Sequence, residues 1–330
     1  MEDQAVSLQG ITQHNGVQQV AHATSSALEN AVQRGQRPLQ KRRRKRIKLA
    51  PYLFILPFVL FFLILFVGPT IYSLILSFYR YRGYGAAVFV GWQNYNALWQ
   101  YGVFWSELRN TIFYWLVHVI PMMALAFLLA LLVRSKLAAW PTFLKPVLFL
   151  PNVMAIVAAS LVFQSFFGTD YGVMNQLLHI KVDWLHNYAI TRYVVVALVL
   201  WRNTGWWFIV FLVGLTSINP DLEEAAHIDG ATLWQRLRFI ILPLMRNTFL
   251  FAFVIDAIGS MRIFTEPNVL LAGGGSMANP EVAPLLNMLV DNLNNGNFGQ
   301  AAAVGWVFFL LGIVAAVIQF RVFRGSEEVE

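Results

Sequence analysis

Long apolar runs constrain this chain more than any other feature of its sequence. A helix needs about 20 mainly apolar residues to cross a bilayer. Six runs reach that length, at about 51–78, 110–133, 143–167, 191–217, 246–270 and 299–322. The chain is 58% hydrophobic and 12% charged, whereas a soluble protein averages about 25% charged residues. These patterns predict an all-α integral membrane protein with six transmembrane helices.

Basic residues predict which side of the membrane each connection faces. A dense cluster between Arg34 and Lys48 precedes the first span, and more Lys and Arg lie in the second and fourth connections and after the last span. Beside a span, such a cluster more often retains the N-terminus in the cytoplasm than binds nucleic acid. By the positive-inside rule, both termini and the fourth connection are predicted to be cytoplasmic. The alternate connections carry few basic residues: Arg80, Arg82, Arg109, Lys181 and Arg192.

The same patterns divide the chain into three predicted parts. Residues 1–48 are predicted to be a cytoplasmic tail, largely disordered and basic at its end, because they are rich in Gln, Ser, Ala and Asn and lack apolar periodicity. Residues 49–324 form the predicted six-span domain, and residues 325–330 a short cytoplasmic tail. No signal peptide is predicted, since the first apolar run is longer than a signal-peptide core.

The fourth connection has the sequence of a polar helix-turn-helix. Asn219 can cap a helix, and Pro220 suits the first helical position. Gly230 is expected to end that helix. A second helix is predicted to start at once, because Thr232 and Gln235 have capping-box spacing.

This connection resembles a motif of a known family. Glu224-Ala225-Ala226, three residues, Gly230, nine residues and then Ile240-x-Leu242-Pro243 resemble the EAA loop in the membrane subunits of bacterial ABC importers. The resemblance extends from about Pro51 to Arg324. Further matches are similar to the carbohydrate-uptake branch, the maltose and glycerol-phosphate permeases: Asn110-Thr111, Leu150-Pro151, Tyr171-Gly172-x-x-Asn175, Asp229-Gly230-Ala231 and Gly273-Gly274.

The resemblance implies an ABC importer type I permease fold in the bacterial inner membrane, with a cytoplasmic EAA coupling helix. It also implies a second permease subunit, expected to be a different chain, two ATP-binding cassette ATPase subunits and an external solute-binding protein. ATP and Mg²⁺ are expected on the ATPase subunits and no cofactor on this chain. The residues implied to contact an ATPase are Glu224, Ala225, Ala226, Asp229, Gly230, Leu242 and Pro243.

No catalytic or metal-binding pattern is present in the sequence. The chain has no Cys, no His-x-x-x-His pair and no Gly-x-x-x-x-Gly-Lys phosphate loop. His118 stands alone in the second apolar run and is assigned no role. The connection from Thr265 to Phe298 carries acidic but no basic residues, so it is predicted to be external and its Gly273-Gly274-Gly275 run to be a turn. The chain is predicted to be a transport subunit and not an enzyme.

Polar residues inside the apolar runs are candidates for a substrate pathway. An arginine at mid-bilayer costs about 2.5–3.5 kcal/mol on insertion scales, so Arg202 is expected to face protein or water. One alternative is an Arg202–Asp256 ion pair that holds two spans together. The other is a set of saccharide contacts, in which two arginines slightly favour a substrate with an anionic group; neutral, acidic and phosphorylated saccharides all stay open. The candidates are Trp201, Arg202, Asn203, Trp206, Asp256 and Arg262.

The aromatic residues in the predicted external connections fit two roles. The external stretches 79–109 and 168–190 contain aromatic residues such as Trp92 and Trp184, which suit membrane-interface anchors and a docking surface equally well.

The alternative function is a stand-alone secondary carrier or channel. Such a carrier would be expected to show inverted repeats or matching broken helices, and no convincing repeat is evident between spans one to three and four to six.

Overall fold

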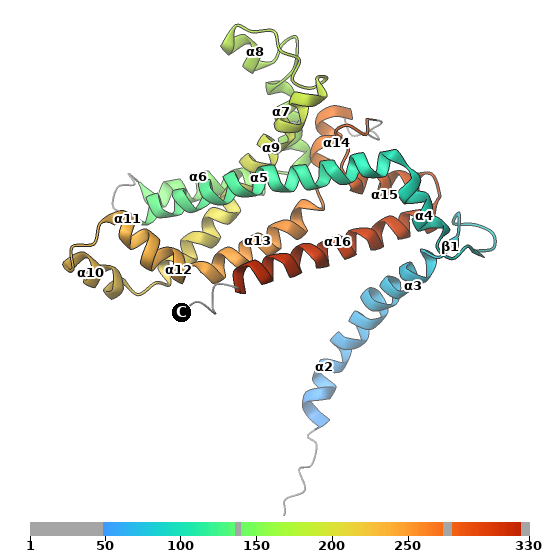
Figure 1. Ribbon diagram of the computed structural model, residues 1–330, viewed down its shortest axis with the longest axis horizontal. Coiled ribbons are helices and arrows are strands. Elements are labelled where there is room, and N and C mark those ends of the chain that lie inside the picture. Colours follow the sequence, from blue (N-terminus) through green and yellow to red (C-terminus); the bar gives the residue numbers. More distant parts are fainter. Residues whose placement is uncertain (1–48, 136–139, 273–278, 325–330) are drawn as a thin grey trace, which may run out of the picture. The chain divides into compact units, whose positions relative to one another are not determined.

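The computed structural model describes residues 49–135, 140–272 and 279–324 (Figure 1). The predicted tails, residues 1–48 and 325–330, and the predicted glycine turn at 273–275 lie outside these residues. The chain divides into two units, Met1–Phe62 and Leu63–Glu330. In the first unit the described element is helix α2 (Leu49–Phe62).

The second unit is almost entirely helical. A single antiparallel hairpin of β1 (Tyr79–Arg80) and β2 (Val88–Phe89) pairs Tyr79 with Phe89. The helices are η1 (Leu63–Val67), α3 (Gly68–Leu76), α4 (Gln93–Gln100), α5 (Gly102–Arg134), α6 (Pro141–Val153), α7 (Ile156–Phe166), α8 (Val173–Leu178), α9 (Tyr188–Thr216), α10 (Pro220–Ile228), α11 (Leu233–Arg236), η2 (Leu237–Ile241), α12 (Leu242–Leu244), α13 (Arg246–Ser260), α14 (Thr265–Ala272), α15 (Leu285–Asn294) and α16 (Phe298–Arg324).

Within the described residues, four helices are long and apolar enough to cross a membrane: Leu53–Leu76, Gly102–Arg134, Tyr188–Thr216 and Phe298–Val322. Two further spans exist if each of two bent helix pairs counts as one. The all-α membrane class is therefore confirmed, with four spans or up to six. The bent pairs are Thr142–Val153 with Ile156–Phe166, at 95°, and Leu233–Leu244 with Arg246–Ser260, at 63°.

Three predicted runs differ from the helices that form. The second begins at Gly102 instead of near residue 110, so Asn110-Thr111 lies inside α5 and does not open it. The third breaks where Met154 and Ala155 adopt extended backbone, with ψ of 140° and 134°. The fifth ends at Ser260 instead of near residue 270. Pro267 would interrupt a continuous helix, but it is tolerated in the first turn of α14.

Polar residues of α5 hold the segment that leads into α15. Glu107, Asn110 and Thr111 are all buried. Their partners are mostly backbone N–H and C=O groups, which would otherwise need hydrogen bonds to water. Asn110 Nδ2 donates to the carbonyls of Pro280 and Ala283 (both 2.9 Å), Thr111 Oγ1 accepts from the Leu285 amide (2.8 Å), and Glu107 Oε2 accepts from the Met288 amide (3.2 Å).

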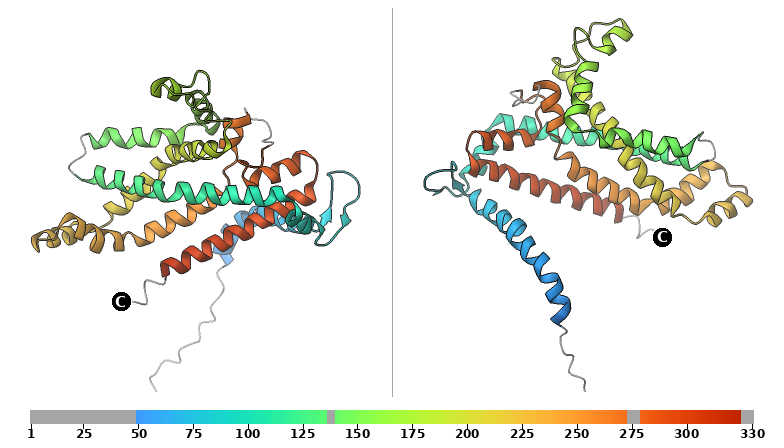
Figure 2. Two further views of the ribbon diagram at one scale, coloured as in Figure 1. Left: turned by 45° about the horizontal axis from the view of Figure 1, so that its top comes forward. Right: turned by 180° about the vertical axis from the view of Figure 1, so that it is seen from behind.

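The main core lies between α5, α9 and α13. Helices α5, α13 and α16 run side by side through the second unit (Figures 1 and 2). Phe127 of α5, Phe211 of α9 and Phe249 of α13 form an aromatic cluster with ring centroids 4.7–5.7 Å apart. Small residues let these helices approach closely, as is usual in membranes.

Gly205 marks the tightest approach between α9 and α6. A Cβ atom at this position would overlap the carbonyl oxygen of Leu148 and lie 2.9 Å from the Phe149 Cα. These obstacles are backbone atoms, so they cannot rotate away. The helix pair can therefore pack at this distance only with glycine here.

We expect Gly205→Ala to destabilise the protein by about 1–3 kcal/mol, the usual cost of overpacking. The matched control is Gly305→Ala in α16, where the nearest atom to a new Cβ is Leu289 Cδ1 at 3.5 Å. Thermal unfolding in detergent would measure both. Equal melting temperatures for the two variants would contradict this account of the α6–α9 contact.

Candidate functional site

A polar cavity of about 310 Å³ lies among α5, α9, α13 and the start of α14. Five of the six candidate pathway residues line it: Arg202, Asn203, Trp206, Asp256 and Arg262. The sixth, Trp201, is not among the lining residues. Its ring packs against Phe163, with centroids 5.5 Å apart. The structure thus gathers residues from two distant apolar runs around one space.

Asp256 pairs with His118 and not with Arg202, so the predicted Arg202–Asp256 ion pair is wrong. His118 Nε2 lies 3.2 Å from Asp256 Oδ2, and the two side chains are 2% and 7% exposed. His118 Nδ1 lies 2.6 Å from the Tyr114 carbonyl. A carbonyl only accepts, so Nδ1 carries a proton. Nε2 is then the ring nitrogen that faces the Asp256 carboxyl, so the two side chains are paired with each other inside the chain.

Arg202 faces Glu266 across the cavity. Its Nη1 lies 4.0 Å from Glu266 Oε1, at the limit of an ion pair, and donates to Asn203 Oδ1 at 3.4 Å. The Arg202 Nε is buried without a hydrogen-bond partner among the described residues. The sequence assigned Glu266 to an external connection, whereas the structure buries it beside the cavity.

The sequence missed His118 and Glu266 as site residues for a physical reason. Each contacts a partner far away along the chain, and neither lies in a local motif. An isolated ionisable residue in an apolar run was the available signal, because such a group needs a partner inside a membrane. His118 and Glu266 both fit that description.

The fourth connection folds as the predicted helix-turn-helix. Asn219 Oδ1 accepts from the Asp221 amide at 3.1 Å and caps α10. Thr232 and Gln235 form the predicted capping box, with contacts of 2.7 and 3.3 Å. Gly230 has φ +79°, a conformation that favours glycine. Local capping and turn chemistry thus determine this segment.

The candidate coupling residues lie on the surface of this segment. Glu224, Ala225, Asp229 and Gly230 are exposed, as are Leu242 and Pro243, and Ala226 is half-buried. Ile228 is 79% exposed despite being apolar. The second helix continues through η2 and α12 to Leu244, and the chain then bends into α13.

An ion pair that the sequence did not predict ties this segment to α5. Arg134 Nη1 at the end of α5 lies 2.7 Å from Glu223 Oε1 in α10. The side chains are 21% and 24% exposed, so water screens the pair only in part. Because α5 also carries His118, one helix contacts both the cavity and the helix-turn-helix.

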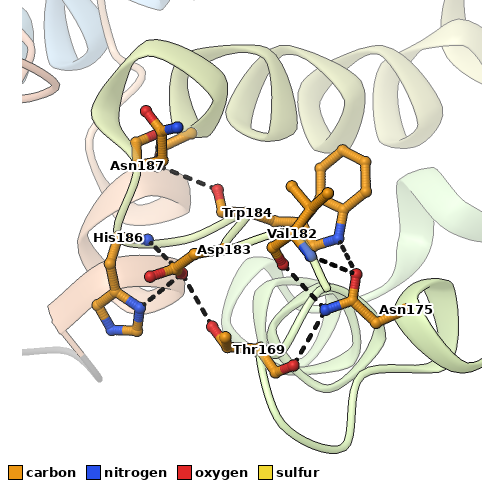
Figure 3. A network of polar contacts seen from close by, with 8 residues as sticks. Thr169, Asn175, Val182, Asp183, Trp184, His186 and Asn187 are labelled. Atoms are coloured by element: carbon orange, nitrogen blue, oxygen red, sulfur yellow. Dashed lines mark hydrogen bonds and ion pairs between the residues drawn. The ribbon is translucent and has the colours of Figure 1, made fainter. Parts of the chain in front are cut away.

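A compact polar network orders the connection between α7 and α9 (Figure 3). Asn175, in the family-like Tyr171-Gly172-x-x-Asn175 segment, is buried at its centre. Its Nδ2 donates to the carbonyls of Thr169 (3.0 Å) and Val182 (2.9 Å), and its Oδ1 accepts from the Trp184 indole (2.7 Å). Trp184 is therefore held inside the loop, while Tyr171 stays 88% exposed.

Asp183 completes this network. Its Oδ1 accepts from Thr169 Oγ1 (2.8 Å) and the His186 amide (3.0 Å), and it lies 2.9 Å from His186 Nδ1. Slight burial of the carboxyl raises its pKa, but the hydrogen bonds from His186 and Thr169 outweigh that effect and lower the pKa of Asp183 below its ordinary value.

Comparisons with known proteins agree with the arrangement of these helices. Residues 97–326 match the family described as "Binding-protein-dependent transport system inner membrane component". The lactose transport system permease protein LacF of Rhizobium radiobacter is 31% identical over 281 residues, which cover 83% of this chain and 93% of LacF. The arabinooligosaccharides transport system permease protein AraP of Bacillus subtilis is 32% identical over 288 residues, covering 84% of this chain and 91% of AraP.

A solved structure shares the fold. It is the crystal structure of a bacterial ABC transporter involved in the import of the acidic polysaccharide alginate. One of its chains superposes with a TM-score of 0.73 at 23% identity, covering 83% of this chain and 95% of that chain. A second structure, of a bacterial alginate ABC transporter with an alginate pentasaccharide-bound periplasmic protein, gives a TM-score of 0.71, also at 23% identity. At this identity the likeness establishes the fold alone.

We expect Arg134→Gln and Glu223→Gln each to loosen α10 by about 1 kcal/mol, the upper value for a partly exposed ion pair. Hydrogen exchange of the α10 amides would report this as faster exchange. The charge-swapped double variant Arg134→Glu/Glu223→Arg should recover much of the protection. If the α10 amides exchange faster in the charge-swapped double variant than in either single variant, the two charges act separately.

The Asp183 network should lose stability in acid. A carboxyl whose folded pKa is lowered stabilises the fold above its ordinary pKa of about 3.9, and the contribution disappears as pH falls through the lower folded value. Hydrogen exchange in residues 169–187, corrected for intrinsic rates, should therefore accelerate in strong acid. Asp183→Asn should show faster exchange already at pH 7. The control Asp170→Asn changes an exposed neighbouring acid and should not. Identical behaviour of the two variants would refute the assignment.

Proposed function

This chain belongs to the family of binding-protein-dependent transport system inner membrane components, and we propose that it is the permease subunit of an ATP-driven importer for a sugar or oligosaccharide. The names of its relatives LacF and AraP support a saccharide cargo. The importer would be completed by a second permease, two ATPase subunits that bind ATP and Mg²⁺, and an external solute-binding protein. Both termini and the coupling segment would face the cytoplasm.

The observation that carries this proposal is the physical connection between the coupling segment and the cavity. The helix-turn-helix leads through α12 into α13, and α13 carries Asp256 and Ser260 in the cavity wall. A displacement of the exposed turn would therefore move part of the wall. The Arg134–Glu223 ion pair adds a second connection, through α5 to His118.

The surface of the coupling segment suits a groove on an ATPase subunit. The small side chains of Ala225 and Ala226 let a partner approach the α10 backbone closely. Exposed Glu224 can accept hydrogen bonds from a basic partner, and exposed Ile228 offers apolar surface to bury. ATP would close the ATPase dimer, draw the two coupling segments together and switch the cavity from inward to outward access.

The cavity has the size and chemistry of a small-ligand site. Ligand pockets are commonly about 300–1,000 Å³, with a few polar groups that orient the ligand. Arg202 and Asn203 supply donors and acceptors for hydroxyl groups, and the half-exposed ring of Trp206 offers a face for sugar C–H groups. Family membership favours this importer role over a stand-alone carrier or channel, which would need neither an ATPase nor a binding protein.

Reconstitution tests the proposal. The chain, its second permease, the ATPases and the binding protein encoded beside it should together show ATP-dependent saccharide uptake in proteoliposomes. Uptake without ATP or without the binding protein would instead support a carrier or channel.

Variants at Gly230 test the coupling role in the same assay. Gly230→Leu should uncouple hydrolysis from uptake, because a branched side chain at φ +79° strains the turn by about 1–2 kcal/mol and enlarges the docking surface. Gly230→Asn is the matched control, since Asn tolerates this backbone conformation. Failure of both variants would locate the defect in the partner groove. Normal uptake and normal stimulated hydrolysis with Gly230→Leu would refute the coupling role.

A further inference from the structure

Apart from Arg262, the charged side chains that line the cavity have partners within the chain. His118 Nε2 lies 3.2 Å from Asp256 Oδ2, so each of these two groups has its partner within the chain. Ser260 Oγ also approaches Asp256 Oδ2 at 3.3 Å. A ligand would therefore meet no free charge at this end of the cavity.

Arg202 has its own counter-charge. Glu266 lies 4.0 Å away, its side chain is 8% exposed, and that of Arg202 is 17% exposed. A second carboxylate brought to Arg202 by a ligand would lie near Glu266, and like charges at short range repel strongly where water is scarce. The remaining cation among the described lining residues, Arg262, has an exposed side chain and lies outside these two pairs.

The cavity also offers a ligand several groups that suit uncharged hydroxyl and C–H surfaces. Asn152 and Asn203 line it with amides that can both donate and accept. The Arg202 guanidinium, which lines the cavity, can donate to a neutral hydroxyl oxygen. Trp206 adds an exposed aromatic face. This combination matches the alternating hydroxyl and C–H surfaces of an uncharged sugar.

We propose that the cavity accepts uncharged saccharides and that Glu266 excludes acidic ones by neutralising Arg202. The inference rests on the proposed saccharide function and narrows its substrate class. It reverses the expectation drawn from the two arginines alone. It also departs from the acidic polysaccharide named for the solved structures of the same fold.

The test measures direct binding to the purified importer, without its binding protein, by saturation-transfer NMR. The probes are neutral lactose and arabinotriose, and trigalacturonate as the acidic trisaccharide. Wild-type protein should bind at least one neutral probe and bind the uronate more weakly than that probe. Glu266→Gln should increase uronate affinity roughly 10- to 100-fold, the range for one charge-assisted hydrogen bond.

Two further variants make the result specific. In Arg202→Gln/Glu266→Gln the gain for the uronate should disappear, because position 202 no longer carries the charge that Glu266→Gln releases. Glu281→Gln, which removes an exposed acid that does not line the cavity, should leave the preference unchanged. Equal or tighter uronate binding by the wild type would overturn the proposal. So would a Glu266→Gln effect no larger than that of Glu281→Gln. If no saccharide binds and proteoliposome uptake is also absent, the proposed function itself fails.

Discussion

The cost of placing charge inside a hydrocarbon layer governs the arrangement of this chain. In lipid, apolar contacts do little to determine which helices pack together, because the surrounding acyl chains are as apolar as the side chains. Paired polar groups do determine which helices pack together. Asp256 with His118 joins α13 to α5, Glu266 beside Arg202 joins α14 to α9, and Glu107 with the Met288 amide joins α5 to α15. The residues that define the cavity are thus also the residues that hold its walls together.

Features that depend on residues close together in the sequence could be predicted. Features that depend on contacts between distant residues could not. Asn219 and the Thr232–Gln235 box were predictable because a cap involves residues two or three positions apart. Apolar runs identified the membrane class for a similar reason. The His118–Asp256 contact spans 138 positions, and no local pattern encodes it. Five of the six candidate pathway residues line one cavity, but their partners are evident only in three dimensions.

Helix ends inside the membrane were the least predictable part of the fold. Hydropathy continues through Met154-Ala155, although the backbone there is extended and the chain turns by 95°. It also continues past Ser260, where Pro267 requires a new helix. Both breaks lie next to the cavity, since Asn152 and Ile156 flank the first and Ser260 and Ile263 the second. Interrupted helices supply the space and the free polar groups that an unbroken span would not.

The paired charges also bear on how the membrane potential acts on transport. Moving one elementary charge across 100 mV changes the free energy by about 2.3 kcal/mol. The His118–Asp256 and Arg202–Glu266 pairs each keep a carboxyl beside its own basic partner, so neither pair moves an unpaired charge through that field when the helices rearrange. An uncharged cargo adds none. For the proposed uncharged cargo, the paired residues therefore add no charge movement of their own, and the step in which they take part should respond little to depolarisation of the membrane.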